Sequence, residues 1–401
     1  MMFQNKSNPA SSMGMGLNSG FGSHSNSHPN SNSKPNLDFV PWIEKYRPKT
    51  LDEMAQEPDI INLFRNNIKT GNMTHYLFYG PPGTGKTSAI LALGREMFKE
   101  HFSERVIEFN ASDDRGINAV REKITSEAKK YHSGIVLADG TIIPPFKIII
   151  LDEFDFMTEE AQDALRVVIE QYSTVTRFCF IGNFISKITD AVKSRCSAIH
   201  FKRLPNAIMI KKLNEIALME SMDISEEIMD TIIEISNGDM RKAIMLLQNL
   251  KYLYDFKRLL TMPLGEIPKA KFKILTPSIL RANFSPTIEV ADIFDIAASI
   301  DMKRARSIIG DLLSCSKVKD IIILRRDIVA LGYPIDTIIS QLNKTILESD
   351  DFDDYKKALI FKYSGSILLK MKECSNERIQ LLDYLTCIHG IYNGVAVYES
   401  I

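Results

Sequence analysis

The chain has 401 residues, of which 45% are hydrophobic and 25% are charged. This length exceeds what one hydrophobic core usually organises, so two or three domains are expected. The formal net charge of −1 excludes a uniformly basic nucleic-acid binder, although the 49 Lys and Arg residues can still gather on one local face.

The hydrophobic residues and the cysteines predict a soluble intracellular protein. No apolar run approaches the roughly 18 residues needed to span a bilayer, and the N-terminus lacks the apolar core of a signal peptide. The five cysteines are an odd number, widely spaced and without a C-x-x-C pair. This pattern is typical of reduced thiols rather than of a disulfide framework or a zinc site.

The first 36 residues have a different composition from the rest. Ser, Asn, Gly and Pro dominate, and Lys6 and Lys34 are the only Lys, Arg, Asp or Glu residues. Such a segment cannot bury enough apolar surface to offset the entropy of ordering, so residues 1–36 are predicted to form a disordered tail. A passive tail and a localisation or weak partner-binding segment both stay open.

Short apolar runs alternate with helical patterns between residues 37 and 203. Strands that are separated by helices predict a parallel sheet covered on both faces, which is an α/β domain. The expected strands lie at 75–80, 105–110, 147–153, 177–183 and 198–202.

Residues 204–254 predict a small unit of three helices. The second helix has Ser225 as its expected N-cap and Asn237–Gly238 as its C-cap pair, and Asp239 is the expected N-cap of the third.

The last two segments are a linker and a third domain. Prolines at 263, 268 and 277 predict a linker with little regular structure over residues 255–285. Residues 286–401 return to amphipathic helical patterns, without a repeat of fixed period that would indicate a solenoid.

"GPPGTGKT", residues 80–87, satisfies G-x-x-x-x-G-K-[ST] between a predicted strand and a predicted helix. The backbone N–H groups of Gly83 and Gly85 and the helix N-terminus are expected to bind phosphates. Lys86 is expected to reach the β- and γ-phosphates, and Thr87 is expected to bind magnesium.

"KIIILDEFD" supplies acidic residues at the end of a buried strand. Asp152 can hold magnesium through water, and Glu153 can polarise a water for in-line attack on the γ-phosphate. Such a strand end is common in proteins, so the phosphate loop upstream is what makes a catalytic interpretation favoured.

Three further polar residues are candidates for the same chemistry. Asn183 ends a strand, where a neutral side chain can orient the attacking water. Arg241 lies in the first turn of a helix, which cations usually avoid, so it is expected to have an anionic partner; a surface ion pair is the alternative. Arg195, in "AVKSRCSAIHF" (191–201), precedes an alternating run typical of a half-buried strand, where a charge needs an anion.

Together these motifs resemble the small subunits of replication factor C, the eukaryotic sliding-clamp loader, which is an AAA+ ATPase assembly. The resemblance rests on motifs in the family's order: "PWIEKYRPKTLDEM", "GPPGTGKTSAILAL", "EFNASDDRGI", "KIIILDE", "KSRC" and "NGDMRKA". It is strong over residues 39–254, whereas the last helices match a collar domain by length and helical character alone. The insertion in "YHSGIVLADGTIIPPFKIIILDE" looks like that of the subunit numbered four in animals and two in fungi.

The resemblance implies a fold and a set of partners. The fold is an AAA+ P-loop domain (37–203) with a five-stranded parallel sheet, then a three-helix lid (204–254) and an all-α collar for oligomerisation (286–401). The implied activity is hydrolysis of ATP with Mg²⁺. The implied partners are the other clamp-loader subunits in a heteropentamer, the sliding clamp and primer–template DNA, in the nucleus.

The resemblance also implies roles for individual residues. Asn183 and Arg241 are expected to act as sensors, and Arg195 as an arginine finger that acts on ATP bound by the neighbouring subunit. Thr87 and Asp152 are the expected metal ligands. The expected adenine-pocket residues are Ile43, Arg47 and Ala55; the expected phosphate-binding residues are Gly80, Pro81, Pro82, Gly83, Thr84, Gly85, Lys86, Thr87 and Ser88; the catalytic set is Lys86, Thr87, Asp152, Glu153, Asn183, Arg195 and Arg241.

Arg115 and Arg121, after "ASDDRG", match family residues that track DNA phosphates. A solvated helix face is the alternative for both arginines. Contact with the DNA backbone without base readout fits a chain whose net charge is −1.

The sequence departs from the family pattern at two positions. Phe154 replaces a small residue after Glu153, which puts the hydrolysis rate in doubt, and Val167 stands where many relatives carry a second arginine. Two other functions therefore stay open. A self-assembling DNA motor is disfavoured because no basic winged domain follows residue 285, and a structural subunit that binds ATP without turnover draws support from Phe154.

Overall fold

The structure is a computed structural model that describes residues 40–111, 120–137, 142–261, 288–373 and 376–394. The predicted tail, residues 1–36, and most of the predicted linker lie outside these ranges. Contacts divide the chain into two units, Met1–Val40 and Pro41–Ile401, and everything below concerns the second unit.

A five-stranded, all-parallel sheet forms the centre of the first domain, as predicted. The strand order is β2-β5-β6-β1-β7, so β1 lies inside the sheet and β7 at its edge. The strands are β1 (Tyr76–Tyr79), β2 (Val106–Asn110), β5 (Lys147–Asp152), β6 (Thr176–Gly182) and β7 (Ser197–His200).

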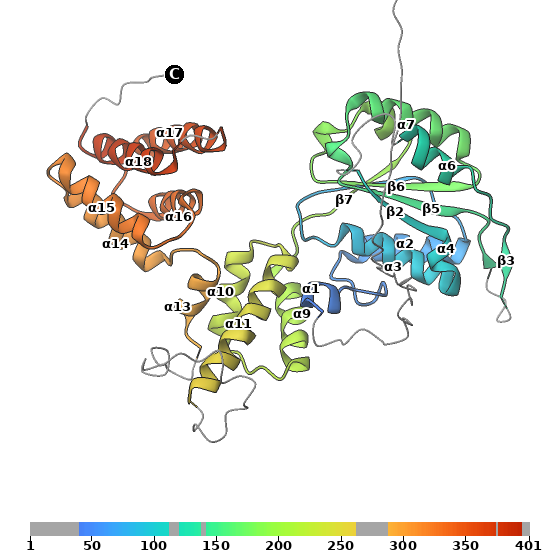
Figure 1. The fold of residues 1–401 in the computed structure, drawn as a ribbon, viewed down its shortest axis with the longest axis horizontal. Helices are drawn as coiled ribbons and strands as arrows, with labels where there is room; N and C mark the ends of the chain where they lie inside the picture. The colour runs from blue at the N-terminus through green and yellow to red at the C-terminus, as the bar shows by residue number, and fades with distance from the viewer. Residues whose placement is uncertain (1–39, 112–119, 138–141, 262–287, 374–375, 395–401) are drawn as a thin grey trace, which may run out of the picture. The chain divides into compact units, whose positions relative to one another are not determined.

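Alternate residues of the inner strands face opposite sides of the sheet, because side chains of a strand alternate. Phe78, Ile148 and Ile150 pack with helices α2 (Pro58–Thr70) and α3 (Lys86–Phe98). Leu77, Ile149 and Leu151 pack on the other face with α6 (Thr125–Ala128) and α7 (Glu159–Tyr172) (Figure 1). The sheet is therefore buried on both faces, and its strand ends carry the functional groups. Short elements complete the domain: α1 (Trp42–Lys45), η2 (Lys99–His101), α4 (Phe102–Arg105), η3 (Val120–Ile124), η4 (Phe154–Phe156), η5 (Ile185–Lys187) and α8 (Asp190–Lys193).

An antiparallel hairpin of β3 (Ile135–Val136) and β4 (Ile142–Ile143) precedes β5 and was not predicted. Arg105, which is 2% exposed, donates to the carbonyls of Ser133, Pro144 and Phe146 and so joins the flanks of the hairpin to α4.

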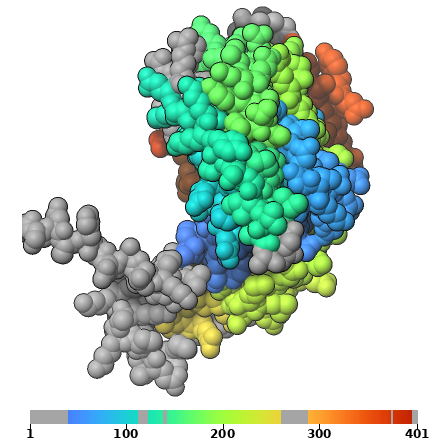
Figure 2. Space-filling model, turned by 90° about the vertical axis from the view of Figure 1, so that its right-hand side faces the viewer, coloured from blue at the N-terminus to red at the C-terminus, as the bar shows by residue number. Residues whose placement is uncertain are grey.

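Elements from α2 to α7, coloured blue to green, make up most of the face seen in Figure 2.

Three helices form the second domain, α9 (Asn206–Met219), α10 (Glu226–Ser236) and α11 (Met240–Thr261). The predicted caps are confirmed: the Ser225 side chain accepts from Ile228 N, and Asn237 is left-handed with φ 50°. Helix α11 continues to Thr261, so the predicted start of the linker at residue 255 falls inside this helix.

Two segments from outside residues 204–254 pack into the core of this helical domain. One is Trp42 of α1, and the other is Ile293 of α13 (Val290–Ile296). The first helix of the predicted collar range therefore contacts α10 and α11.

The last part of the chain packs five helices around a core of its own. A partly buried hydrogen-bonded chain runs from Tyr384 OH through the Asn343 side chain to Ser364 Oγ. Among the described residues, no helix is long and apolar enough to cross a membrane. The helices are α14 (Met302–Ser314), α15 (Val318–Ala330), α16 (Ile335–Glu348), α17 (Asp354–Lys372) and α18 (Glu377–Tyr392).

Candidate active site

The loop 80–85 joins the end of β1 to the start of α3 and can be formed only with glycine at its turns. Gly83 and Gly85 have φ values of 71° and 87°, a left-handed region that other residues enter at a cost. A Cβ atom on Gly80 would lie 2.1 Å from the carbonyl oxygen of Phe201. The loop thus directs the N-terminus of a 13-residue helix at the site, which is an arrangement that binds anions.

Lys86 is buried beneath this loop. Its Nζ donates to the carbonyls of Gly80 at 2.8 Å and Pro81 at 2.7 Å and to Asn183 Oδ1 at 3.1 Å. Burial lowers the pKa of Lys86 to about 8, although the charge of Asp152 opposes this shift. The ammonium group therefore gains from any anion that enters the loop.

Asp152 lies at the end of β5, beside the start of α3. Its Oδ2 accepts a 2.7 Å hydrogen bond from Thr87 Oγ1, and its Oδ1 accepts from the backbone N–H of Glu153 at 2.8 Å. The hydroxyl and carboxylate oxygens of this pair are the hard ligands that Mg²⁺ prefers, so the residues fit the predicted metal. Glu153 has φ 56°, a strained conformation for a residue with a side chain.

Phe154 is accommodated inside the domain. Its ring is fully buried and lies 4.6 Å from that of Phe180, centroid to centroid, in the core between the sheet and α7. The bulky side chain is thus part of the core. The hydrogen bonds of Asp152 to Thr87 and to the N–H of Glu153 are present together with it.

Gln162 of α7 connects the loops that follow β5 and β6, a role that no local sequence pattern indicates. Its Nε2 donates to the carbonyls of Met157 and Lys187, and its Oε1 accepts from Thr189 N at 2.9 Å. Gln162 has no exposed surface, and its bond to Met157 is buried, whereas those to Lys187 and Thr189 are partly buried. They hold the segment that follows Asn183.

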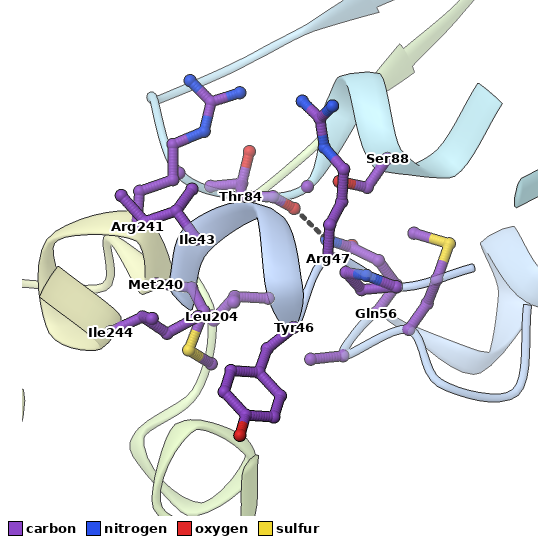
Figure 3. A pocket seen from close by; sticks show the side chains of 15 residues that line it. Ile43, Tyr46, Arg47, Gln56, Thr84, Ser88, Leu204, Met240, Arg241 and Ile244 are labelled. Carbon is purple, nitrogen blue, oxygen red and sulfur yellow. Dashed lines mark hydrogen bonds between the residues drawn. The ribbon is translucent and has the colours of Figure 1, made fainter. Parts of the chain in front are cut away.

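A mostly apolar pocket lies beside the phosphate loop (Figure 3). Eight of the predicted nucleotide-binding residues line it: Ile43, Arg47, Ala55, Gly83, Thr84, Gly85, Ser88 and Arg241. The sequence did not single out the others: Tyr46, Pro48, Met54, Gln56, Leu204, Met240 and Ile244. The i, i+4 spacing of Met240 and Ile244 on α11 is a signal that could have found two of them.

The lid helix α11 begins directly at the phosphate loop. Met240 N donates to the carbonyl of Gly83 at 3.2 Å, and Asp239 caps the helix by accepting from the N–H groups of Arg241 and Lys242. In Figure 3, the side chains of Arg241 and Arg47 extend past Thr84 toward the same side of the pocket, whereas Tyr46 points the other way. Two cations thus flank the mouth of the phosphate loop.

The α1 segment is tied to the lid as well. Lys45 Nζ and Tyr46 OH both donate to Glu220, at the end of α9, and Trp42 N donates to Gln248 Oε1 at 3.1 Å. The pocket wall that contains Ile43 and Arg47 is therefore attached to the lid domain.

Comparison with protein families bears directly on this site. Residues 76–204 match the ATPase family associated with various cellular activities (AAA). Residues 211–251 match the RCF1/5-like, AAA+ ATPase lid domain, and residues 291–387 match the replication factor C C-terminal domain. A protein named replication factor C small subunit L510, from Acanthamoeba polyphaga mimivirus, is 59% identical over 88% of this chain and 97% of its own length.

The chain belongs to the replication factor C small subunit family. Replication factor C subunit 2 of Schizosaccharomyces pombe is 38% identical over 87% of this chain and 94% of its own length. Replication factor C subunit 4 of Homo sapiens is 35% identical over 86% of each chain. The predicted family, and the predicted similarity to the subunit numbered four in animals and two in fungi, are confirmed.

In this replication factor C small subunit, Arg195 does not line the pocket described above. It follows α8 and precedes edge strand β7, and its guanidinium pairs with Glu170 of α7. Glu170 thus provides Arg195 with an anion in its own chain, and the role of Arg195 on a neighbour's ATP stays a prediction.

The residues predicted to contact DNA are described only in part. Arg115 lies outside the described residues, and for Arg121 the structure describes the backbone alone, in the π-helical turn η3. Val167, where many relatives carry an arginine, is 53% exposed on α7.

Proposed function

We propose that this chain is the ATP-hydrolysing small subunit of a heteropentameric clamp loader that places a sliding clamp on primer–template DNA. Membership of the replication factor C small subunit family supports ATP hydrolysis and assembly with other clamp-loader subunits. The observation that carries the proposal is the hydrogen bond between the start of lid helix α11 and the phosphate loop. A nucleotide bound there contacts both domains at once, so its γ-phosphate can change how they pack.

The adenine base occupies the pocket beside the phosphate loop, against Ile43, Arg47 and Ala55, which all line it. The phosphates bind in the loop formed by Gly80, Pro81, Pro82, Gly83, Thr84 and Gly85 and at Ser88 in the first turn of α3. The N–H donors come from the residues other than the two prolines, which have no N–H. Arg241 approaches the γ-phosphate from the lid, which provides the anionic partner that its place in the first helical turn requires.

Hydrolysis is proposed to use groups at the ends of β5 and β6. Lys86 exchanges its loop carbonyls for phosphate oxygens, which restores full charge to its ammonium group. Glu153 accepts a proton from the attacking water, and Asn183 orients that water. Thr87 and Asp152 would hold Mg²⁺, which neutralises charge on the transferred phosphoryl group.

Arg195 is proposed to act in trans on the nucleotide of an adjoining subunit. Its own site already has Lys86 and Arg241 as cations, and Arg195 belongs to a different surface. An arginine that reaches a neighbour's γ-phosphate can raise hydrolysis by several powers of ten. This arrangement makes hydrolysis depend on assembly.

Arg115 and Arg121 are proposed to contact DNA phosphates. The assembled complex is proposed to work in the nucleus. ATP binding tightens the assembly around clamp and DNA, and hydrolysis releases both. Expression of the chain with a fluorescent tag tests the location, because exclusion from the nucleus contradicts it.

The proposed function is tested by co-expression of the chain with candidate partner subunits. The assembled complex is expected to contain four related chains beside this one and to hydrolyse ATP faster when clamp and primer–template DNA are both present. A rate that is indifferent to clamp and DNA contradicts clamp loading. Homohexamers at native mass would favour a self-assembling motor instead.

A further inference from the structure

Arg195 is held by its own chain at both ends of its guanidinium group. Glu170 Oε1 lies 2.6 Å from Nε and 2.5 Å from Nη2. On the other side, Nη1 donates to the carbonyl of Ala191 at 2.8 Å and to Ser194 Oγ at 3.0 Å. Since the guanidinium is planar with five N–H donors, contacts at all three nitrogens fix its plane, and Nη2 keeps a second N–H for another acceptor.

Glu170 occupies a place where a carboxylate is disfavoured. It lies in the last turn of α7, which ends at Tyr172, and the helix dipole makes this end negative. The last turn of α7 contains no basic residue that could balance the charge. Arg195, from the segment between α8 and β7, provides the missing cation.

The pair is also open to an outside anion. The side chains of Arg195 and Glu170 are 30% and 55% exposed, so a phosphate from another subunit can reach the guanidinium without unfolding of this domain. A flexible arginine loses rotamer freedom when it binds, and contacts that already hold it reduce this loss.

We propose that Glu170 is a positioning residue for Arg195. By holding the Nε–Nη2 edge, Glu170 keeps the guanidinium extended from its own domain toward the nucleotide of the adjoining subunit. The inference rests on the proposed function, in which Arg195 acts in trans. In this proposal Glu170 acts on the reaction only through Arg195.

The test is a double-mutant cycle in the assembled complex. The steady-state ATPase rate with clamp and primer–template DNA is measured for Glu170→Ala, Arg195→Ala and the double variant. Glu170→Gln keeps an acceptor oxygen at the same distance along the side chain, and Glu160→Ala removes an exposed carboxylate from the first turn of the same helix as a matched control. Gel filtration of each complex verifies assembly.

Arg195→Ala defines the share of the rate that depends on the finger. Glu170→Ala is expected to lower that share by roughly twofold or more, which is the lower end of the coupling between residues in contact. The KM for ATP is expected to stay constant, Glu170→Gln to retain more of the rate, and Glu160→Ala to have no effect. In the Arg195→Ala background, Glu170→Ala is expected to change nothing.

The outcomes separate the inference from the proposed function. An unchanged rate in Arg195→Ala overturns the trans role itself. If Arg195→Ala is slow but Glu170→Ala is unaffected or faster, or if the two losses multiply, the positioning role is overturned and the trans role stands. Should Glu170→Ala fail to assemble, the same comparison is made with Glu170→Gln.

Discussion

Met240 N donates to the carbonyl of Gly83, so the lid helix begins on the phosphate loop itself. The two residues come from different domains and are separated by most of the α/β fold in sequence. Any change in the loop is therefore transmitted to α11, and any movement of α11 changes the loop.

Gly83→Ala tests this contact. A Cβ atom at Gly83 would lie 1.7 Å from Asp239 Oδ1, and φ 71° is unfavourable for alanine. The substitution is expected to displace the start of α11 and weaken ATP binding by roughly tenfold or more, measured by titration with a fluorescent ATP analogue. Gly310→Ala, inside helix α14 with no atom within 4 Å of its added Cβ, is the matched control. ATP affinity that is equally unaffected in both variants would contradict the role of the contact.

The lowered pKa of Lys86 predicts a pH dependence of ATP binding. The free chain has a Lys86 pKa of about 8, and bound phosphates raise it because they favour the ammonium form. ATP binding therefore takes up protons near this pH, and the affinity is expected to fall roughly fivefold between pH 8 and pH 9. Calorimetry in two buffers of different ionisation enthalpy measures the uptake. Absence of proton uptake over this range would show that the lysine is already fully protonated in the free chain.

Glu153→Gln separates a catalytic subunit from a structural one. Loss of a general base is expected to slow hydrolysis at this site by about 10²–10⁴-fold, whereas ATP binding is retained because the phosphate loop is unchanged. Single-turnover hydrolysis by the assembled complex measures the step. If the rate with Glu153→Gln equals that of the wild type, the site binds ATP without turning it over.

Gln162→Ala is expected to destabilise the chain by about 2–4 kcal/mol. The substitution leaves the carbonyls of Met157 and Lys187 and the N–H of Thr189 without the side chain that pairs them inside the domain. Urea unfolding followed by circular dichroism measures the change. Gln171→Ala, at an exposed position of the same helix, controls for the loss of a glutamine from α7. Equal midpoints for the two variants would mean that water replaces all three bonds of Gln162.

The parts of this site that could be predicted from the sequence are those specified by neighbouring residues. The glycine-rich motif at 80–87 and the apolar run that ends at Asp152 are each specified by adjacent residues. The structure has the loop between β1 and α3 and Asp152 at the end of β5, as the sequence predicts. The bond between Glu170 and Arg195 and the packing of Trp42 into the lid join residues far apart in the chain, and no local pattern reports them. Helix α11 passes residue 254 because residues 255–261 contain no helix breaker, and it is helical as far as Thr261, the last described residue before the gap.

The most direct test of the central claim compares wild type with Arg195→Ala in two assays. One assay is ATP binding by the isolated chain, and the other is ATP hydrolysis by the assembled complex with clamp and primer–template DNA. The account predicts unchanged binding and slower hydrolysis, because Arg195 acts on a neighbour's nucleotide. Loss of ATP binding by the isolated variant chain, or hydrolysis by the variant complex at the wild-type rate, would contradict it.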